Sequence, residues 1–542
     1  MKYRSTSENT INNKLLFILL IAAFSTAFYR TAWVAEDAFI TFRVIDNTLN
    51  GLGLVWNPGE RVQAFTHPLW FFLLLPLIEI FKDPYYVAIS LSYGLLLCTF
   101  SITWKLLRDT EWRSWLAFSA LLWSHSFIDY SSSGLENPLI HFFAVLFIWI
   151  WIRQGNIFLL SLVGSALFLC RPDAIILIAP SIIWQLFKTR NWHSALLGIS
   201  PAAIWTLFSL FYYGTPVPNT ALAKVGTDIS LIENFQQALK YFQWVYDSDP
   251  VTLAILFIGT TCGFLDKKFR PLSIGIILFI AYLFYVGADY MGGRFLSYPA
   301  LVATLLMALS NFKIATNALL TILIYSIGSL STTIFSPTHF MRSYIINGIA
   351  DERGFYYQNL GLSPVLRAKS WRTHSWFREG ELEPGLYTRC AIGMAAYSGG
   401  PHIQWIDRLA LTEPFLARLP SRTGVRVGHY ERAFPDGFLE SKVSNENLIS
   451  DENLRKLYDD VTFATKHPLF APERWGAIWR LNTGFHKNSF NNFDRNSIGL
   501  PGIPVETESP LSCYGLIYGG VISWKIEGIP ASVKIIMPQQ NP

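Results

Sequence analysis

Long apolar runs set the strongest limit on what this chain can fold into. They lie at residues 14–34, 84–107, 114–131, 138–153, 156–170, 174–188, 194–213, 250–265, 271–288, 295–310 and 313–335. A helix of roughly 20 apolar residues crosses a bilayer, so most of these runs are long enough to span one, straight or tilted. Only 15% of the residues are charged and the mean hydropathy is +0.31, whereas soluble domains carry about 25% charged residues. We therefore predict a polytopic α-helical membrane protein with about 11 transmembrane helices.

Basic residues mark one side of this predicted membrane domain. The loops WKLLRDTEWR, RQGN, FKTRNWH, LDKKFR and NFK, with the N-terminal tail, are denser in Lys and Arg than the loops between them. The positive-inside rule places them in the cytoplasm. The tail has no small-residue cleavage site, which predicts an uncleaved anchor in the cytoplasmic (inner) membrane. The shorter run at residues 68–82 predicts a helix in the interface.

The composition changes after residue 335, where charge, Gly and Pro increase and no long apolar run follows. We expect a transmembrane domain over residues 1–335 and a periplasmic soluble domain over residues 336–542, because an odd number of spans puts the C-terminal part outside. Strand-like LYTRCAIGMAAY, HIQWIDRLAL, GGVISWKIEG and ASVKIIM flank helical DENLRKLYDDV. This pattern predicts a mixed α/β domain.

The five cysteines fall into two groups. Cys98, Cys170 and Cys262 lie in apolar runs, which favours buried free thiols. Cys390 and Cys513 lie in the polar C-terminal part, where a disulfide or two unbridged thiols are the alternatives. We find no Cys/His spacing of a metal site. No Lys/Arg cluster is dense enough to indicate a nucleic-acid partner.

Polar residues gather in the loops expected on the outer face, in the motifs AEDAFITFR, AFTHPLW, SSSGLENPL, RPD, YYGTPVPNTALAK and GADYMGGRFL. Charged groups at helix ends near a bilayer are costly unless they pair or line a wet cavity. We therefore expect one polar vestibule in which acidic and basic side chains face each other. Its members are Asp37, Glu136, Asp173 and Asp289 with Arg43, Arg171, Lys224 and Arg294.

Two adjacent acids, Glu36 and Asp37, follow the first apolar run. Neighbouring side chains on a helix or strand point in different directions, so these two cannot share one task. We expect one to face the chemistry and the other to hold a basic residue, a backbone amide or a cation. The alternative is a pair that caps the following helix.

Other members of the vestibule are candidates for substrate binding. Lys224 and Arg294 could hold a phosphate, as a point charge and as a bidentate fork, or extend toward the interface as snorkelling side chains. His67, which precedes a proline, is either a substrate ligand or a satisfied interfacial histidine. Glu136 and Asp173 each lie at the end of a span, where pairing with Arg171 is the alternative to a role at the site.

The chain resembles a known family over about residues 14–480. The resemblance is carried by WVAEDAFITFRVIDNTLNGLGLVWNPGERVQAFTHPLW, SGLENPL, RPDA, YYGTPVPNTALAKVG, GADYMGGRFL, DERGFYY, AIGMAAY and IDRLALTEPFLARLP. These motifs resemble the AftB-type arabinofuranosyltransferases of the GT-C superfamily. The resemblance implies a GT-C fold and a membrane enzyme that transfers a sugar, arabinofuranose in the family, from a polyprenyl-phosphate donor to a glycan acceptor outside the cytoplasmic membrane.

The resemblance also implies roles for particular residues. In GT-C enzymes an acid of the first outer loop is central, which carries over onto Asp37, with Glu36 where the family usually has a second Asp. Glycosyl transfer needs a carboxylate as base and positive charge at the departing phosphate. Asp37 supplies the carboxylate. The available positively charged partners for the phosphate are Arg43, Lys224 and Arg294. A divalent cation would be an alternative charge stabiliser.

Two rival functions remain at this point. The same group includes bacterial proteins labelled flagellar motor control proteins, so the alternative is a non-enzymatic membrane protein that supports the motor. For such a protein the vestibule residues would be dispensable. A secondary transporter would need inverted repeats and acids near the middle of the membrane, and the sequence shows neither.

Overall fold

The computed structural model describes residues 7–110, 112–153, 155–225, 227–310, 345–378, 384–425, 427–491, 493–496, 520–525 and 532–537. The chain forms two compact units, each built from segments that are discontinuous in sequence. Unit 1 comprises Met1–Ala35, His67–Ala203 and Leu231–Thr373, and unit 2 comprises Glu36–Thr66, Ile204–Ser230 and His374–Pro542. The domain boundary that we expect at residue 335 lies outside the described residues, and this division stays a prediction.

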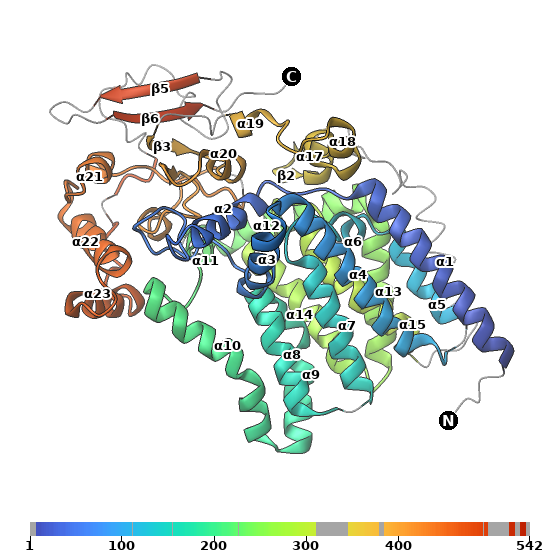
Figure 1. Cartoon of the computed structure of the whole chain (residues 1–542). Coiled ribbons are helices and arrows are strands. Elements are labelled where there is room, and N and C mark those ends of the chain that lie inside the picture. Colours follow the sequence, from blue (N-terminus) through green and yellow to red (C-terminus); the bar gives the residue numbers. More distant parts are fainter. Residues whose placement is uncertain are drawn as a thin grey trace. The chain divides into compact units, whose positions relative to one another are not determined.

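Unit 1 is mainly helical (Figure 1). Its elements are α1 (Ser7–Thr31), α3 (Pro68–Phe81), α4 (Pro84–Leu107), α5 (Trp112–Ser119), η1 (Ala120–Trp123), α6 (His125–Asp129), α7 (Asn137–Arg153), α8 (Ile157–Cys170), η2 (Pro172–Ala174), α9 (Ile175–Thr189), the first part of α10 (Trp192–Tyr213), α12 (Leu231–Ser248), α13 (Pro250–Leu265), α14 (Arg270–Val286), η3 (Arg294–Leu296), α15 (Ser297–Leu309), β1 (Ile345–Ile346), β2 (Ile349–Ala350), α17 (Glu352–Leu360) and α18 (Leu362–Ala368).

Most predicted runs form helices, with one correction. The run at residues 114–131 is not one helix but three short ones, α5, η1 and α6, and the Ser124 hydroxyl caps the last of them by accepting from the Phe127 N–H. The run at residues 313–335 lies outside the described residues. Helix α12 fills a stretch in which we expected no apolar run, because its apolar residues form only one face.

Helix length supports part of the predicted membrane architecture. Among the described residues, Asn13–Thr31, Pro84–Leu107 and Trp192–Tyr213 are long and apolar enough to cross a membrane. A fourth span is added if α12 and α13, which meet at 107°, act as one broken span. The remaining apolar helices are shorter. The chain is therefore mostly helical with several apolar helices, and the number of about 11 spans stays a prediction.

Two helix pairs of unit 1 are in backbone contact through glycines. A Cβ atom added at Gly275 of α14 would lie 1.6 Å from the backbone oxygen of Leu177 in α9, and one at Gly259 of α13 would lie 2.1 Å from that of Ala303 in α15. Small residues permit such close approach between apolar helices.

Unit 2 combines helices with a small sheet. Its elements are the second part of α10, and α2 (Ala38–Leu49), α11 (Asn219–Val225), α19 (Ser375–Arg378), β3 (Gly385–Arg389), α20 (Gly393–Gly399), β4 (Ile403–Asp407), η4 (Leu416–Arg418), α21 (Phe438–Ser444), α22 (Glu452–Lys466), α23 (Pro472–Asn482), β5 (Gly520–Lys525) and β6 (Ser532–Met537). The strand order is β4-β3-β6-β5. Strand β3 is parallel to β4 and β6, while β5 is antiparallel to β6.

The strand predictions in unit 2 are confirmed except in the second half of LYTRCAIGMAAY, where Gly393–Gly399 forms helix α20. LYTRCAIGMAAY and HIQWIDRLAL contain β3 and β4, and GGVISWKIEG and ASVKIIM contain β5 and β6. Helix α20 connects the parallel strands β3 and β4, as such strands require a crossover. The predicted helix DENLRKLYDDV is part of α22. Its apolar side packs in a core with η4 and α21 around Phe415, Phe438 and Tyr458.

Candidate functional site

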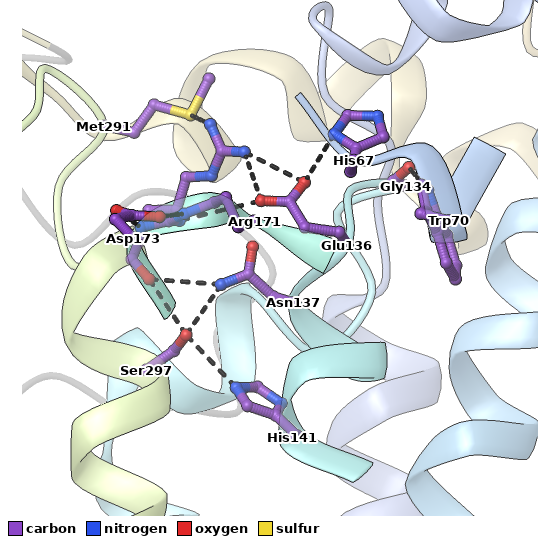
Figure 2. Close-up of polar contacts among 11 residues, drawn as sticks. His67, Trp70, Gly134, Glu136, Asn137, His141, Arg171, Asp173, Met291 and Ser297 are labelled. Carbon is purple, nitrogen blue, oxygen red and sulfur yellow. Dashed lines mark hydrogen bonds and ion pairs between the residues drawn. The ribbon is translucent and has the colours of Figure 1, made fainter. Parts of the chain in front are cut away.

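A cluster of charged side chains lies at helix ends in unit 1 (Figure 2). Glu136, directly before α7, is at its centre and is fully buried. Its carboxylate accepts two hydrogen bonds from Nη2 of Arg294, at 3.0 and 3.3 Å. His67 Nδ1 lies 3.2 Å from Oε2, and Arg171 Nη1 lies 3.7 Å from Oε1. Three segments that are far apart in the sequence therefore meet at one acid.

Arg171 is held on its other side by a second acid. Its Nε and Nη2 atoms each lie 2.7 Å from an oxygen of Asp173 in a bidentate ion pair. The guanidinium also lies over the ring of Phe295, 3.9 Å from the ring centre. The helix-end pairing that we kept as an alternative for Asp173 is thus present, and its role in substrate binding stays a prediction.

The charges in this cluster stabilise one another. Burial opposes ionisation of Glu136, but Arg294, His67 and Arg171 outweigh it and lower the pKa of this carboxyl well below its ordinary value. Burial likewise opposes the charge on Arg171, while Asp173 and Glu136 raise its pKa. Both groups stay ionised near neutral pH, so the cluster presents two fixed guanidinium groups.

The loop that carries Glu136 is anchored by its backbone. Gly134 has a φ of +75°, a conformation that favours glycine. Its carbonyl accepts a hydrogen bond from the Trp70 indole at 3.1 Å, and the carbonyl of Ser133 accepts one from the N–H of Ala35 at 2.8 Å. The loop is therefore fixed to the start of α3 and to the segment that follows α1.

Asn137 and His141 extend this polar site into the helices. The Asn137 amide donates to the hydroxyl of Ser297 at 2.9 Å and to the carbonyl of Arg294 at 3.3 Å. His141 Nε2 lies 3.3 Å from the same hydroxyl. Sequence reasoning missed these residues, although an Asn and a His four residues apart in an apolar run was an available signal.

Several buried polar atoms of unit 1 lack a hydrogen-bond partner among the described residues. They are the hydroxyls of Ser132 and Ser133, the amide oxygen of Asn137 and Oδ2 of Asp289. The first three flank Glu136 in sequence, and Asp289 lies in the loop that leads to Arg294. Buried polar groups are nearly always satisfied, so each of these atoms has the capacity for one further hydrogen bond.

A second buried ion pair in unit 1 joins Asp129 and Arg353, with 2.6 Å between Oδ1 and Nε. Asp129 ends α6, and Arg353 lies in the first turn of α17, within the DERGFYY motif. Sequence reasoning did not single out either residue. Their pairing fastens α17 to α6, which gives this part of the motif a structural role.

The two adjacent acids of the first loop lie in unit 2. Glu36 is buried, and its Oε1 accepts from the N–H of Met394 at 3.2 Å, at the start of α20. Burial, and then the charge of Asp37, raise the pKa of Glu36 to about 8. Asp37 is half-buried at the N-cap position of α2, but its side chain makes no capping hydrogen bond. The expectation that one acid holds a backbone amide is confirmed.

Arg43 and Lys224 also belong to unit 2. Arg43 is buried and donates to the carbonyls of Trp56, Gly400 and Ile403 at 3.1, 2.9 and 2.8 Å, and to that of Ala396. These contacts tie α2 to the segment between α20 and β4. Lys224 is half-buried in the last turn of α11. The structure thus joins His67, Glu136, Arg171, Asp173 and Arg294, and the single vestibule with all the other members stays a prediction.

No group of three or more His, Cys, Asp or Glu side chains that could hold a metal ion occurs in the described part of the chain. Cys98, Cys170 and Cys262 are free thiols. Cys170 and Cys262 are buried as predicted, whereas the predicted burial of Cys98 is wrong, because its side chain lies on an exposed face of α4. Cys390 is disulfide-bonded. Cys513, the partner considered for it, lies outside the described residues.

Two curated proteins are similar to this chain, and both are terminal beta-(1->2)-arabinofuranosyltransferases. The one from Mycobacterium tuberculosis is 23% identical over 522 residues, which cover 75% of this chain and 82% of that protein. The one from Corynebacterium glutamicum is 22% identical over 504 residues, which cover 73% of this chain and 72% of that protein. No protein-family model and no solved structure matches. The two relatives confirm the predicted resemblance and support a glycosyltransferase activity, and they do not favour the non-enzymatic alternative.

Proposed function

We propose that this chain, which is similar to two arabinofuranosyltransferases over about three quarters of its length, is a membrane glycosyltransferase with a polyprenyl-phosphate sugar donor. It transfers the sugar, arabinofuranose by analogy with the relatives, to a glycan acceptor on the outer side of the cytoplasmic membrane. The observation that carries the proposal is the buried Glu136 cluster, with two arginines at the ends of apolar helices. A donor with a lipid tail has to be bound where its phosphate leaves the bilayer.

The two arginines of the cluster suit a departing phosphate. A guanidinium group binds phosphate oxygens through a planar fork of donors. Arg294 is oriented by Glu136 and Arg171 by Asp173, so neither has to reorganise when negative charge develops on the leaving group. The paired acids also keep the buried site close to neutral when no donor is bound. The unsatisfied hydroxyls of Ser132 and Ser133 supply neutral partners for a sugar.

Asp37 is the proposed general base. Glu36 has a pKa of about 8, so it is mostly protonated at neutral pH and is a positioning residue at α20. Asp37 accepts the proton of the acceptor hydroxyl while the new bond forms between that oxygen and the anomeric carbon. The bond from the anomeric carbon to the phosphate oxygen breaks, and the polyprenyl phosphate leaves with the electron pair.

The experiment that tests this function measures transfer of radiolabelled sugar from polyprenyl-phosphate donors, with the arabinofuranosyl donor first, by membranes that contain the full chain. Asp37→Asn should lower the transfer rate by about 10²-fold or more, since general-base catalysis contributes about 10² to 10⁴. Asp46→Asn in the same helix is the matched control and should leave the rate unchanged. Equal rates for wild type and Asp37→Asn at equal abundance would refute the role of Asp37. Absence of transfer from every donor would refute the enzyme proposal.

A further inference from the structure

A small pocket in unit 2 is lined by two arginines and, among the described residues, by no acidic side chain. It lies between the segment at residues 61–63, the end of α10, the start of α11, η4, and helices α22 and α23. Arg61 and Arg418 contribute the basic groups, and Gln63, Thr215 and Asn219 contribute neutral polar ones. The empty space is about 280 Å³ when the part open to solvent is included. Three of the stretches that carry the family resemblance, at residues 33–70, 212–226 and 406–420, thus contribute to this pocket.

Some buried basic residues of unit 2 pair with acids, whereas Arg43, Arg432 and Arg474 donate to backbone carbonyls. Arg408 pairs with Glu431, and Lys442 pairs with Glu413 at 2.9 Å. Arg61 and Arg418 form no ion pair with any acid among the described residues. Arg61 Nη2 contacts the carbonyls of Ala464, at 3.5 Å, and His467, and its buried Nε has no hydrogen-bond partner among the described residues. Two buried or half-buried positive charges therefore lie here without a countercharge.

The surroundings make these positive charges costly. Arg418 donates to the carbonyl of Pro414 at 2.6 Å, and burial lowers its pKa to about 10. Burial lowers the pKa of Arg61, and the nearby charge of Arg61 contributes to lowering the pKa of Arg474, after burial. Placing such charges out of water without a partner is costly, so an anion that binds here recovers that cost.

The neutral polar groups of the pocket are already engaged. Asn219 donates to the carbonyls of Ala410 and Leu411 at 2.9 and 3.0 Å. Gln63 donates to the carbonyl of Phe65 and accepts from Ser209 at 2.9 Å. A neutral sugar would find few free partners, whereas a carboxylate or phosphate oxygen would meet guanidinium donors.

We propose that this pocket is an oxyanion site that binds a carboxylate or phosphate group carried by the glycan acceptor. Binding of the anion follows from the pocket itself, and the link to the acceptor rests on the proposed function. The inner space admits a group about the size of one water molecule, so one oxygen of a terminal carboxylate or phosphate enters while the rest of that group and of the acceptor stays in the part open to solvent. The pocket also belongs to the same compact unit as Asp37.

Binding is tested first with the purified full chain in detergent, by equilibrium dialysis against radiolabelled inorganic phosphate at constant ionic strength, with acetate as competitor. The wild type should bind phosphate saturably, and Arg418→Gln and Arg61→Gln should each weaken binding about tenfold or more. Arg418→Lys, which keeps the charge and loses the fork, should lie between. Arg495→Gln is the matched control, because Arg495 pairs with Asp228 at 2.8 Å in the same unit, and it should bind as the wild type does. Melting temperatures verify that the variants are folded.

A second arm separates the two sources of the anion. In the transfer assay, Arg418→Gln should raise the KM of an acceptor that carries a uronic acid or a phosphate, leave kcat unchanged, and leave the KM of the matching neutral acceptor unchanged. Saturable phosphate binding with unchanged KM values would show a site for the free ion and overturn the acceptor assignment. No saturable binding of either anion, or equal weakening by Arg495→Gln, would overturn the site. Phosphate binding without any sugar transfer would leave the site standing and refute the proposed function.

Discussion

Glu136 shows how the cost of burying a charge depends on its partners. The carboxylate is fully buried, and two arginines and a histidine surround it. Glu136→Gln leaves Arg294 without its acid, and removing one partner of a buried ion pair costs about 3–5 kcal/mol. We therefore expect a clear decrease in the unfolding midpoint of the purified protein.

The matched control for Glu136 is an exposed ion pair. Asp228 is 76% exposed and pairs with Arg495, and such pairs contribute about 1 kcal/mol or less. Asp228→Asn should therefore leave the unfolding midpoint almost unchanged in the same detergent. Equal midpoints for the variants at positions 136 and 228 would contradict a stabilised charge at Glu136.

Glu36 predicts a pH dependence of stability with a definite sign. Burial and Asp37 raise its pKa from 4.5 to about 8. Between these values the folded chain binds a proton that the unfolded chain has released, so the free energy of unfolding falls as pH rises from about 5 to about 8. Below and above this window the effect is constant.

The measurement for Glu36 compares unfolding midpoints of the wild type and Glu36→Gln across that pH range. Gln cannot ionise and keeps the acceptor for the N–H of Met394, so the variant should lose part of the decrease seen in the wild type. Identical pH profiles would show that Glu36 titrates near its ordinary value.

At the scale of elements, the close glycine contacts between helices make the stability of unit 1 sensitive to any added side-chain atom at these positions. A Cβ at Gly275 would lie 1.6 Å from a backbone oxygen of α9, and no side chain can move to relieve that contact. Gly275→Ala should lower the unfolding midpoint, since overpacking costs about 1–3 kcal/mol. Gly94→Ala in α4 is the control, because nothing lies within 4 Å of its added Cβ. There Ala should be neutral or stabilising by up to about 1 kcal/mol, and a loss as large as at position 275 would argue against the close crossing.

Local sequence signals located the elements but not all of their breaks. Helix α4 has the predicted bounds, and β3 and β4 lie in the predicted strand segments. The run at residues 114–131 misled because its apolar content hides two serines, Ser119 and Ser124, that lie at the junctions of three short helices. A serine lowers the mean hydropathy of an apolar run only slightly. A hydropathy profile therefore does not detect a serine that caps a new helix.

At the scale of the whole molecule, the predicted topology is directly testable. The loop LDKKFR, which joins α13 to α14, should be cytoplasmic, and the C-terminal part should be periplasmic. Alkaline phosphatase is active only outside the cytoplasm. A fusion after residue 542 should therefore be active and one after Lys268 inactive. The reverse pattern would overturn the orientation, and activity in both would contradict the odd number of spans.

The sequence by itself determined that the chain is mainly helical and apolar, which segments hold the four strands β3 to β6, and which polar motifs follow its helices. These properties depend on residues that are near one another in the chain. Only the tertiary structure decided which charges pair. In the folded chain Glu136 pairs with Arg294, His67 and Arg171. Arg43 donates hydrogen bonds to backbone carbonyls.

Tertiary structure also joined residues 36–66 and 204–230 to the C-terminal part in one compact unit, although the sequence placed them among the membrane helices. The same packing placed Arg61 and Arg418 at one pocket, where neither forms an ion pair with an acid of the described part of the chain. The sequence offers several possible partners for each charged side chain. Which of them pair depends on the cost of burying the charge and on the distance to the opposite charge, and both are set only by the fold.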